Sequence, residues 1–365
     1  MNADTQGAPV VPVVPTTSTT STPSTTSTTS TPPALLPPLP PHEVDLAPLR
    51  RAARWRPAEV AFWLLPGIAF FAFPQSHLLL SQIAIVSLFA LSLDLILGYA
   101  GIISLGHAAF FGVGAYTAGL LAAHGFGDPL LGLAAALVLS ALAGFITSFL
   151  VLRGTDLTRL MVTIGVGLML YEAANKLTRY TGGTDGLQGV EMKPLLGLYR
   201  FDMAGTTAYL YALAVLFVMF WIARRLVHSP FGMSLRGIKQ NALRMPALGT
   251  PVHRRLIAVY VIGAGYAGVA GALLAQTTQF VSIDVFSFSR SAEVMLILVL
   301  GGTGGLYGAL LGTILFVVAH DLLSGINPQY WQFWLGLLLI VVVLFARDGI
   351  LGALRRVSAH WPSRT

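Results

Sequence analysis

Long apolar runs, separated by short polar connections, follow one another from residue 58 to residue 346 of this chain. A helix needs about 20 apolar residues to cross a bilayer, where every backbone polar group must be satisfied internally. Charged residues make up 10% of the chain, whereas soluble domains carry about a quarter. We therefore predict an all-α, polytopic transmembrane helix bundle. Its ten predicted spans lie near residues 58–73, 78–97, 104–123, 129–151, 158–176, 206–223, 256–276, 291–303, 305–323 and 331–346.

The positions of the basic residues predict how the bundle is oriented. With both termini in the cytoplasm, seventeen Lys and Arg residues fall on the cytoplasmic side and five on the outer side, which obeys the positive-inside rule. Three parts are expected: a disordered, Thr/Ser/Pro-rich cytoplasmic tail at 1–45, a transmembrane domain at 46–350 and a basic C-terminal tail at 351–365. Because the basic residues gather at helix ends, we expect contact with membrane lipid and no nucleic-acid partner.

The stretch at 98–123 is apolar yet unusually rich in glycine. Glycine permits close backbone approach or a break in a helix, and polar groups at this depth are tolerated where they face protein, water or a passing solute. Ser104 and His107 lie inside the stretch, so we expect it to line a translocation pathway. For His107 the alternative is a hydrogen-bonded packing residue. The residues predicted to line the pathway are Asp94, Ser104, Gly106, His107, Phe110, Phe111 and Tyr116.

The cytoplasmic connection at 227–254 is basic and amphipathic. Apolar residues recur in it at helical spacing, with basic side chains off the apolar stripe. Ser229 followed by Pro230 is typical of a helix start, and Pro246 is expected to end the helix just beyond Met245. A short helix on the cytoplasmic face follows, and periodicity alone allows it to bind either lipid headgroups or a protein partner. The stripe comprises Phe231, Leu235, Ile238, Ala242 and Met245, beside Arg236, Lys239 and Arg244.

Glycines at four-residue spacing form two further groups, which predicts small-residue faces for close helix packing. Phosphate binding is the alternative for such glycines. No Gly-Lys-Ser/Thr sequence follows any of them, so the chain has no Walker A loop and is not expected to hydrolyse ATP by that chemistry. The predicted packing residues are Gly263 and Gly271 in one group and Gly301, Gly304, Gly308 and Gly312 in the other.

Few ionisable residues fall within the predicted spans, where each needs a partner or a neutral form. Asp94, near the cytoplasmic end of its span, either reaches water or faces the pathway. Glu293 follows Arg290 near the outer surface, which predicts an interfacial ion pair. The chain has no cysteine, and neither a metal-ligand pattern nor a catalytic set emerges, so no cofactor, metal or enzymatic activity is predicted. A gradient-driven secondary transporter with Asp94, His107 and Glu293 as a relay is the competing interpretation.

Four motifs, in this order along the chain, resemble those of branched-chain amino acid ABC transporter permeases, especially of the LivM type. The first is carried by GYAG at 98–101, SLGHAAF at 104–110 and GVGAY at 112–116. Residues 181–187 resemble the outer-loop motif of these permeases, 229–249 the cytoplasmic coupling segment, and 293–312 the glycine-rich late spans. The resemblance covers residues 58–350.

This resemblance implies a permease subunit of an ABC importer in the bacterial plasma (inner) membrane, with 46–350 as its permease domain. It implies four kinds of partner: a second permease subunit in a heterodimer, two cytoplasmic ATPase subunits, an extracytoplasmic solute-binding protein and membrane lipid. It also favours a protein partner for the segment at 229–249. The residues then expected to couple the chain to the ATPase are Phe231, Leu235, Arg236, Ile238, Lys239 and Gly249.

Several positions depart from the pattern of these permeases. Asp94 stands where they usually carry Asn, Ile102 where Gln is common, and Ala242 where an acidic residue is frequent. Urea, short amides or another small polar solute therefore stay open as substrates beside branched-chain amino acids.

Overall fold

The computed structural model describes residues 57–337, except for 155, 196, 198, 200, 201, 203, 204, 327, 331 and 332, together with residues 340, 344, 349 and 352. The predicted tail at 1–45 lies outside these residues, as do most of the predicted tail at 351–365 and more than half of the predicted span at 331–346. The described residues form helices joined by turns, with isolated β-bridges but no strand among them, so the predicted all-α fold is confirmed there.

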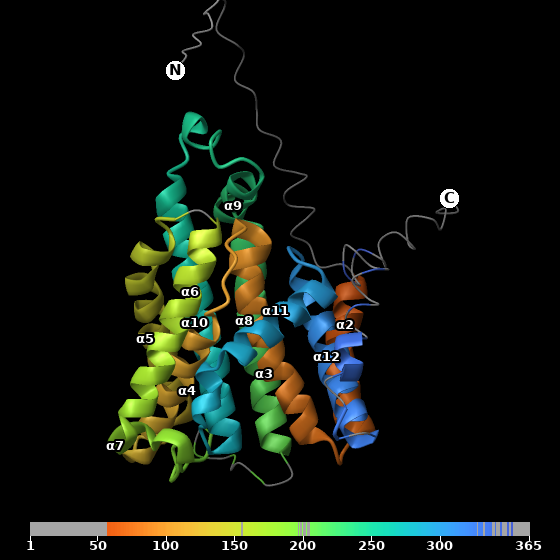
Figure 1. Ribbon diagram of the computed structural model, residues 1–365. Helices are drawn as coiled ribbons and strands as arrows, with labels where there is room; N and C mark the ends of the chain where they lie inside the picture. Colours follow the sequence, from red (N-terminus) through yellow and green to blue (C-terminus); the bar gives the residue numbers. More distant parts are fainter. Residues whose placement is uncertain are drawn as a thin grey trace, which may run out of the picture. The chain divides into compact units, whose positions relative to one another are not determined.

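Figure 1 shows the helices, and those that correspond to predicted spans begin and end within four residues of them. The largest differences are at the start of α4, the end of α8 and the start of α10. Short 3₁₀ turns lie in the connections, and the end of α3 continues into a π-helical turn, η1. The helices are α2 (Pro57–Ala72), α3 (His77–Leu93), η1 (Asp94–Tyr99), α4 (Ala108–Ala123), α5 (Pro129–Val151), α6 (Asp156–Lys176), α7 (Thr178–Thr181), α8 (Thr206–Val227), α9 (Pro230–Gln240), α10 (Val252–Thr278), α11 (Phe288–Gly301) and α12 (Leu306–Ile326).

Six of the described helices are long and apolar enough to cross a membrane: α3 with η1, α5, α6, α8, α10 and α12. The apolar helices α2 and α4 are shorter, and α11 has 14 residues. The outer face of α5 carries exposed large apolar side chains, among them Leu139, Ile146 and Leu150. Such a surface is stable against lipid and unfavourable in water. These features indicate a multi-pass membrane protein.

Helix α10 is the central element of the bundle and packs against α3, α4 and α5. In its most apolar window 78% of the residues are buried, against 22% in α5 and in α6. A Cβ at Gly263 would overlap the side chain of Ile96 in η1, and a Cβ at Gly271 would overlap the carbonyl group of Phe111 in α4. These glycines therefore allow two neighbouring elements to approach α10 closely.

Helices α11 and α12 pack on each other through glycine. A Cβ at Gly301 would overlap the carbonyl oxygen of Gly308, and one at Gly312 would come within 3.0 Å of the backbone of Gly301. Gly304 differs from the prediction, because it lies in the turn between the two helices with a φ of +80°. A four-residue spacing marks one helix face only where the helix is continuous, and α12 begins after Gly304.

The glycine-rich stretch is broken at its start. Helix α4 begins at Ala108, four residues later than predicted, because residues 101–107 are irregular. Gly101 has a φ of +74°, a conformation that favours glycine and ends the preceding helix. Gly112 and Gly114 then lie inside a continuous helix. The break therefore separates α3 and η1 from α4 and does not interrupt α4.

Candidate functional site

The glycines of the predicted pathway pack against other parts of the chain. A Cβ at Gly106 would overlap the carbonyl oxygen of Thr163 in α6, and a Cβ at Gly114 would overlap the backbone of Gly268 in α10. Both positions thus bring α4 and the segment before it into backbone contact with a neighbouring helix. Gly106 therefore packs against α6, and its predicted place in the pathway stays a prediction.

The other predicted pathway side chains are buried. The Nε2 atom of His107 lies 2.7 Å from the Ser92 hydroxyl, and its ring stacks on Phe89 with the centroids 5.6 Å apart. Ser104 is 1% exposed, and no partner for its hydroxyl is found among the described residues. These contacts are the ones expected of His107 under the alternative from the sequence, a hydrogen-bonded packing residue. Of the predicted set, Phe110 and Tyr116 are also buried, Phe111 borders a cavity described below, and Asp94 occupies a separate site.

Asp94 connects the end of α3 to the turn between α11 and α12. Its side chain is fully buried, so it does not reach water as one interpretation of the sequence expected. The Gly304 N–H donates to Asp94 Oδ1 at 2.7 Å, and Oδ2 has no hydrogen-bond partner among the described residues. A Cβ at Gly98 would overlap the Asp94 carboxylate. The contact between η1 and the turn therefore depends on glycine at both 98 and 304.

Helix α9 is fixed to the same place. The Lys239 Nζ donates to the carbonyl oxygen of Gly98 at 2.8 Å, and the Arg236 guanidinium lies 5.2 Å from the centre of the Tyr99 ring. A charged hydrogen bond of this kind contributes roughly 1.5–3 kcal/mol when shielded from water, and less where the side chain is exposed as Lys239 is. Three elements, η1, α9 and the turn between α11 and α12, thus form one contact region.

The apolar stripe of α9 faces the bundle. Leu235 and Ile238 are 2% and 4% exposed, so they are packed within this chain and are not free to enter a groove on another protein. The helix also ends earlier than predicted, at Gln240, because Asn241 adopts an extended conformation. The large apolar side chains that α9 and the following turns leave exposed are Met233, Leu243 and Leu248, and Gly249 follows them in a turn with a φ of +76°.

A cavity of about 780 Å³ lies between α3, the end of α10 and α11. Gln82, Arg290 and Glu293 line one part of it, and Phe89 and Phe111 line another. The Arg290 Nη1 is 3.0 Å from Glu293 Oε2, which agrees with the ion pair that the sequence predicted. The two charged side chains are 38% and 30% exposed, so the pair is accessible from the cavity.

The same polar residues border a second cavity of about 880 Å³, on the side of α12. Sequence reasoning did not connect Gln82 with Arg290 and Glu293, although a glutamine inside an apolar span is a signal for a functional face. The connection depends on α3 and α11 being neighbours, which the order of the spans does not reveal. Among the described residues no group of three or more His, Asp or Glu side chains is placed to hold a metal ion.

Residues 77–343 match the family described as branched-chain amino acid transport system / permease component. The chain belongs to this family. It is 30% identical over 287 residues to the high-affinity branched-chain amino acid transport system permease protein LivM of Salmonella typhimurium, and equally so to LivM of Escherichia coli. The matched region is 72% of this chain and 66% of each LivM. LivH of Escherichia coli is 23% identical over 286 residues, which are 73% of this chain and 91% of LivH.

This permease-family chain spans just under two thirds of the length of the LivM relatives. No solved structure matches it. The family pattern begins at His77, the first residue of α3. It therefore covers the helices that form the cavity, the contact region around Asp94 and all of α9.

Proposed function

We propose that this chain is the transmembrane permease subunit of an ABC importer for branched-chain amino acids. The family match carries the proposal, because it covers nearly all the described helices. The relatives LivM and LivH are named as permease proteins of branched-chain amino acid transport systems. ATP is hydrolysed by partner subunits, since the chain lacks a Walker A loop.

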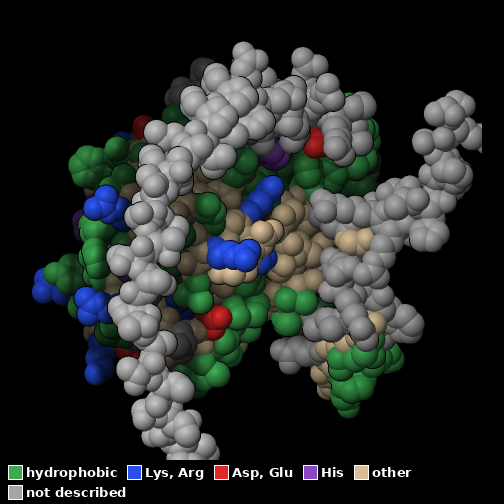
Figure 2. Space-filling model, turned by 90° about the horizontal axis from the view of Figure 1, so that it is seen from above, with side chains coloured by type: hydrophobic (Ala, Val, Ile, Leu, Met, Phe, Trp, Pro, Cys, Tyr) green, Lys and Arg blue, Asp and Glu red, His purple; other side chains and the backbone are tan. Residues whose placement is uncertain are grey.

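The permease lies in the bacterial plasma (inner) membrane with about ten spans and with both termini in the cytoplasm. Its permease domain is 46–350, flanked by the cytoplasmic tails at 1–45 and 351–365. Figure 2 views the end of the bundle that carries α9, and blue Lys and Arg side chains are spread over the part of this end that is drawn in colour. Those exposed there include Arg236, Lys239 and Arg244. A basic end of this kind supports its assignment to the cytoplasmic side.

The segment at 229–249 couples the permease to a cytoplasmic ATPase through its outer surface. Because Leu235 and Ile238 are packed against the bundle, the docking residues are the exposed Met233, Leu243 and Leu248, with basic side chains beside them. The inner surface of α9 meets η1 through Lys239. A displacement of α9 by the ATPase would therefore act on η1 directly.

The importer further contains a second permease, in a heterodimer with this chain, two ATPase subunits and an extracytoplasmic solute-binding protein. The stretch at 104–116 forms one wall of the transport pathway, and Phe111 is its side chain that contacts the solute. His107 and Phe110 are buried and pack on the side of that wall facing away from the solute.

Reconstitution in proteoliposomes tests this function. The chain, its second permease and the ATPases are inserted together, and leucine uptake is measured with the binding protein outside and ATP inside. We expect uptake that needs ATP and all partner subunits. Accumulation of leucine by this chain without ATPases, driven by a proton or sodium gradient, would show a secondary transporter. Uptake of urea or a short amide in place of leucine would refute the substrate.

A further inference from the structure

We propose that the cavity between α3, α10 and α11 is a solute site of the permease, in which Arg290 receives the carboxylate of an α-amino acid and Glu293 its ammonium group. The inference rests on the proposed function and adds a binding site to it. Three features of the cavity carry it: a continuous face on each of two helices, a polar part that holds both signs of charge, and an apolar part further along the same helices.

The cavity follows one face of α3 and one face of α11. Gln82 lies in the second turn of α3 and Arg290 in the first turn of α11, and Phe89 and Ile297 lie two turns further along each helix. Residues seven apart share a helix face. The cavity therefore extends along both helices for two turns, changing from polar to apolar with distance from the helix starts.

The polar part suits a zwitterion. Arg290 presents a planar set of N–H donors that matches a carboxylate, and Glu293 accepts hydrogen bonds from an ammonium group. In this structure the two side chains pair with each other at 3.0 Å, so each of these two charges has a partner. A bound zwitterion replaces this one ion pair with two and adds no net charge to the cavity, which Asp202 also lines. An amine or a carboxylic acid alone would leave one protein charge without a partner.

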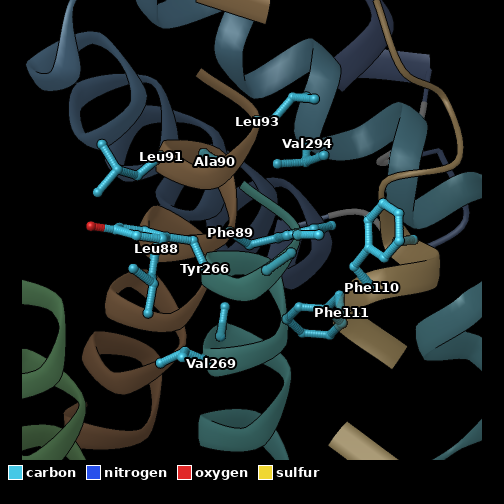
Figure 3. Close-up of a cluster of buried hydrophobic side chains, with 14 of the residues drawn as sticks. Leu88, Phe89, Ala90, Leu91, Leu93, Phe110, Phe111, Tyr266, Val269 and Val294 are labelled. Carbon is cyan, nitrogen blue, oxygen red and sulfur yellow. The ribbon is translucent and has the colours of Figure 1, made fainter. Parts of the chain in front are cut away.

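The apolar part suits a branched side chain. The rings of Phe89 and Phe111 are 4.6 Å apart, and Val294 and Ile297 line the same cavity from α11. Figure 3 shows Phe89, Phe111 and Val294 together in the bundle interior, coming from three different helices. Burying aliphatic carbon there is favourable by about 25 cal/mol for each Å² removed from water. The cavity volume of about 780 Å³ also falls within the range of roughly 300–1,000 Å³ typical of small-molecule sites.

The absence of cysteine from the sequence allows a direct test. Gln82→Cys is introduced into the full importer, whose partner chains are made free of reactive thiols, and a charged, membrane-impermeant thiol reagent is added from the outer side. We expect leucine to slow the labelling. Isoamylamine, which lacks the carboxylate, and isocaproate, which lacks the ammonium group, should need at least about ten times the concentration, because each forfeits one charged hydrogen bond.

Two charge-neutralising variants assign the roles of the ion pair. In the Gln82→Cys background, Arg290→Gln and Glu293→Gln should each raise the half-protecting leucine concentration about 10- to 100-fold. Phe126→Cys is the control, because Phe126 is 62% exposed in the connection before α5 and does not line the cavity. It should be labelled at a rate that leucine does not change. Leu78→Cys, also on the cavity face of α3, replaces Gln82→Cys if that variant fails to assemble.

The outcomes separate this site from the proposed function. If the wild-type importer takes up leucine but leucine does not protect residue 82 or residue 78, the site is wrong and the function stands. Equal protection of Phe126→Cys, or unchanged protection in both charge variants, also overturns the site. If the reagent labels neither Gln82→Cys nor Leu78→Cys, the site is also overturned, because a solute site must admit the reagent. If the wild-type importer takes up no leucine, the proposed function itself fails.

Discussion

Gly106 provides the sharpest test of how the glycine-rich stretch is built. A Cβ at residue 106 would overlap the carbonyl oxygen of Thr163, a backbone atom that cannot move without moving α6. Gly106 has no positive φ, so the cost of Gly106→Ala comes from this overlap and not from backbone strain. Overpacking of one methyl group costs roughly 1–3 kcal/mol, which corresponds to a fall of a few degrees in the midpoint of thermal denaturation.

The matched controls are two glycines of α6. A Cβ at Gly165 meets nothing within 4 Å, so Gly165→Ala should stabilise the helix by about 0.5–1 kcal/mol. A Cβ at Gly167 would lie 3.4 Å from the Cα of Gly106, an ordinary contact, so Gly167→Ala should be close to neutral. The assay is thermal denaturation of the detergent-solubilised chain, read as the fraction that remains monodisperse. If Gly106→Ala is as stable as Gly165→Ala, the close contact between α6 and the segment before α4 does not exist.

Three further pairs of substitutions test the cytoplasmic segment and its contacts with the bundle. Leu235→Asp should abolish accumulation of folded chain, because Leu235 is 2% exposed, whereas Leu243→Asp should fold normally and lose copurification with the ATPase, because Leu243 is 92% exposed. Lys239→Met removes the hydrogen bond to the Gly98 carbonyl of η1 and should lower the amount of leucine taken up per ATP hydrolysed. Arg244→Met is the control and should leave that ratio unchanged, because the described residues show no hydrogen bond from the Arg244 side chain to η1. Asp94→Asn keeps an oxygen that accepts from the α11–α12 turn and should stay within about 1 kcal/mol of wild type, whereas Asp94→Ala should cost roughly 1–3 kcal/mol in thermal stability.

Each of these comparisons has a result that contradicts it. Normal folding of Leu235→Asp would mean that α9 does not pack on the bundle. Copurification of Leu243→Asp with its ATPase at wild-type stoichiometry would remove this side chain from the docking surface. If Lys239→Met leaves leucine uptake per ATP hydrolysed unchanged, the bond to η1 takes no part in coupling. If Asp94→Asn and Asp94→Ala are equally stable, the hydrogen bond from the Gly304 N–H to Asp94 contributes nothing to stability.

The helices themselves could be predicted because each span is a local property of the sequence. The span at 129–151 coincides with α5 residue for residue, since Asp128 caps the helix and Pro129 fits its first position. The start of α4 was placed four residues too early because residues 104–107 carry neither proline nor a charged residue that would mark a helix boundary. Their backbone is set by Gly101 and by contacts with distant residues, such as the bond from the Leu105 N–H to the Thr163 hydroxyl at 3.3 Å.

The functional positions were harder to predict because glycine spacing does not say what a glycine faces. Gly106 and Gly304 occur in similar apolar, glycine-rich surroundings, yet one meets a backbone carbonyl of α6 and the other donates its N–H to Asp94. The amphipathic stripe was a helix face as far as Ile238, with Ala242 and Met245 beyond the end of α9. Periodicity gives no means to distinguish packing against the same chain from docking on another. Leu235 is buried by this chain, and that fact depends entirely on tertiary structure.

The contacts also connect the cytoplasmic segment to the cavity. Lys239 of α9 bonds to η1, and Asp94 at the start of η1 bonds to the turn that ends α11. Helix α11 then carries Glu293 two turns back from that end, beside the cavity. A helix of 14 residues moves as a unit on the timescale of transport. A shift of its Gly301 end therefore also moves the Arg290–Glu293 ion pair. The Arg290–Glu293 pair is held within α11 and Gln82 belongs to α3, which continues into η1, so both polar walls of the cavity are carried by helices that end at this contact. Binding of a zwitterion and movement of α9 therefore act on the same pair of helices.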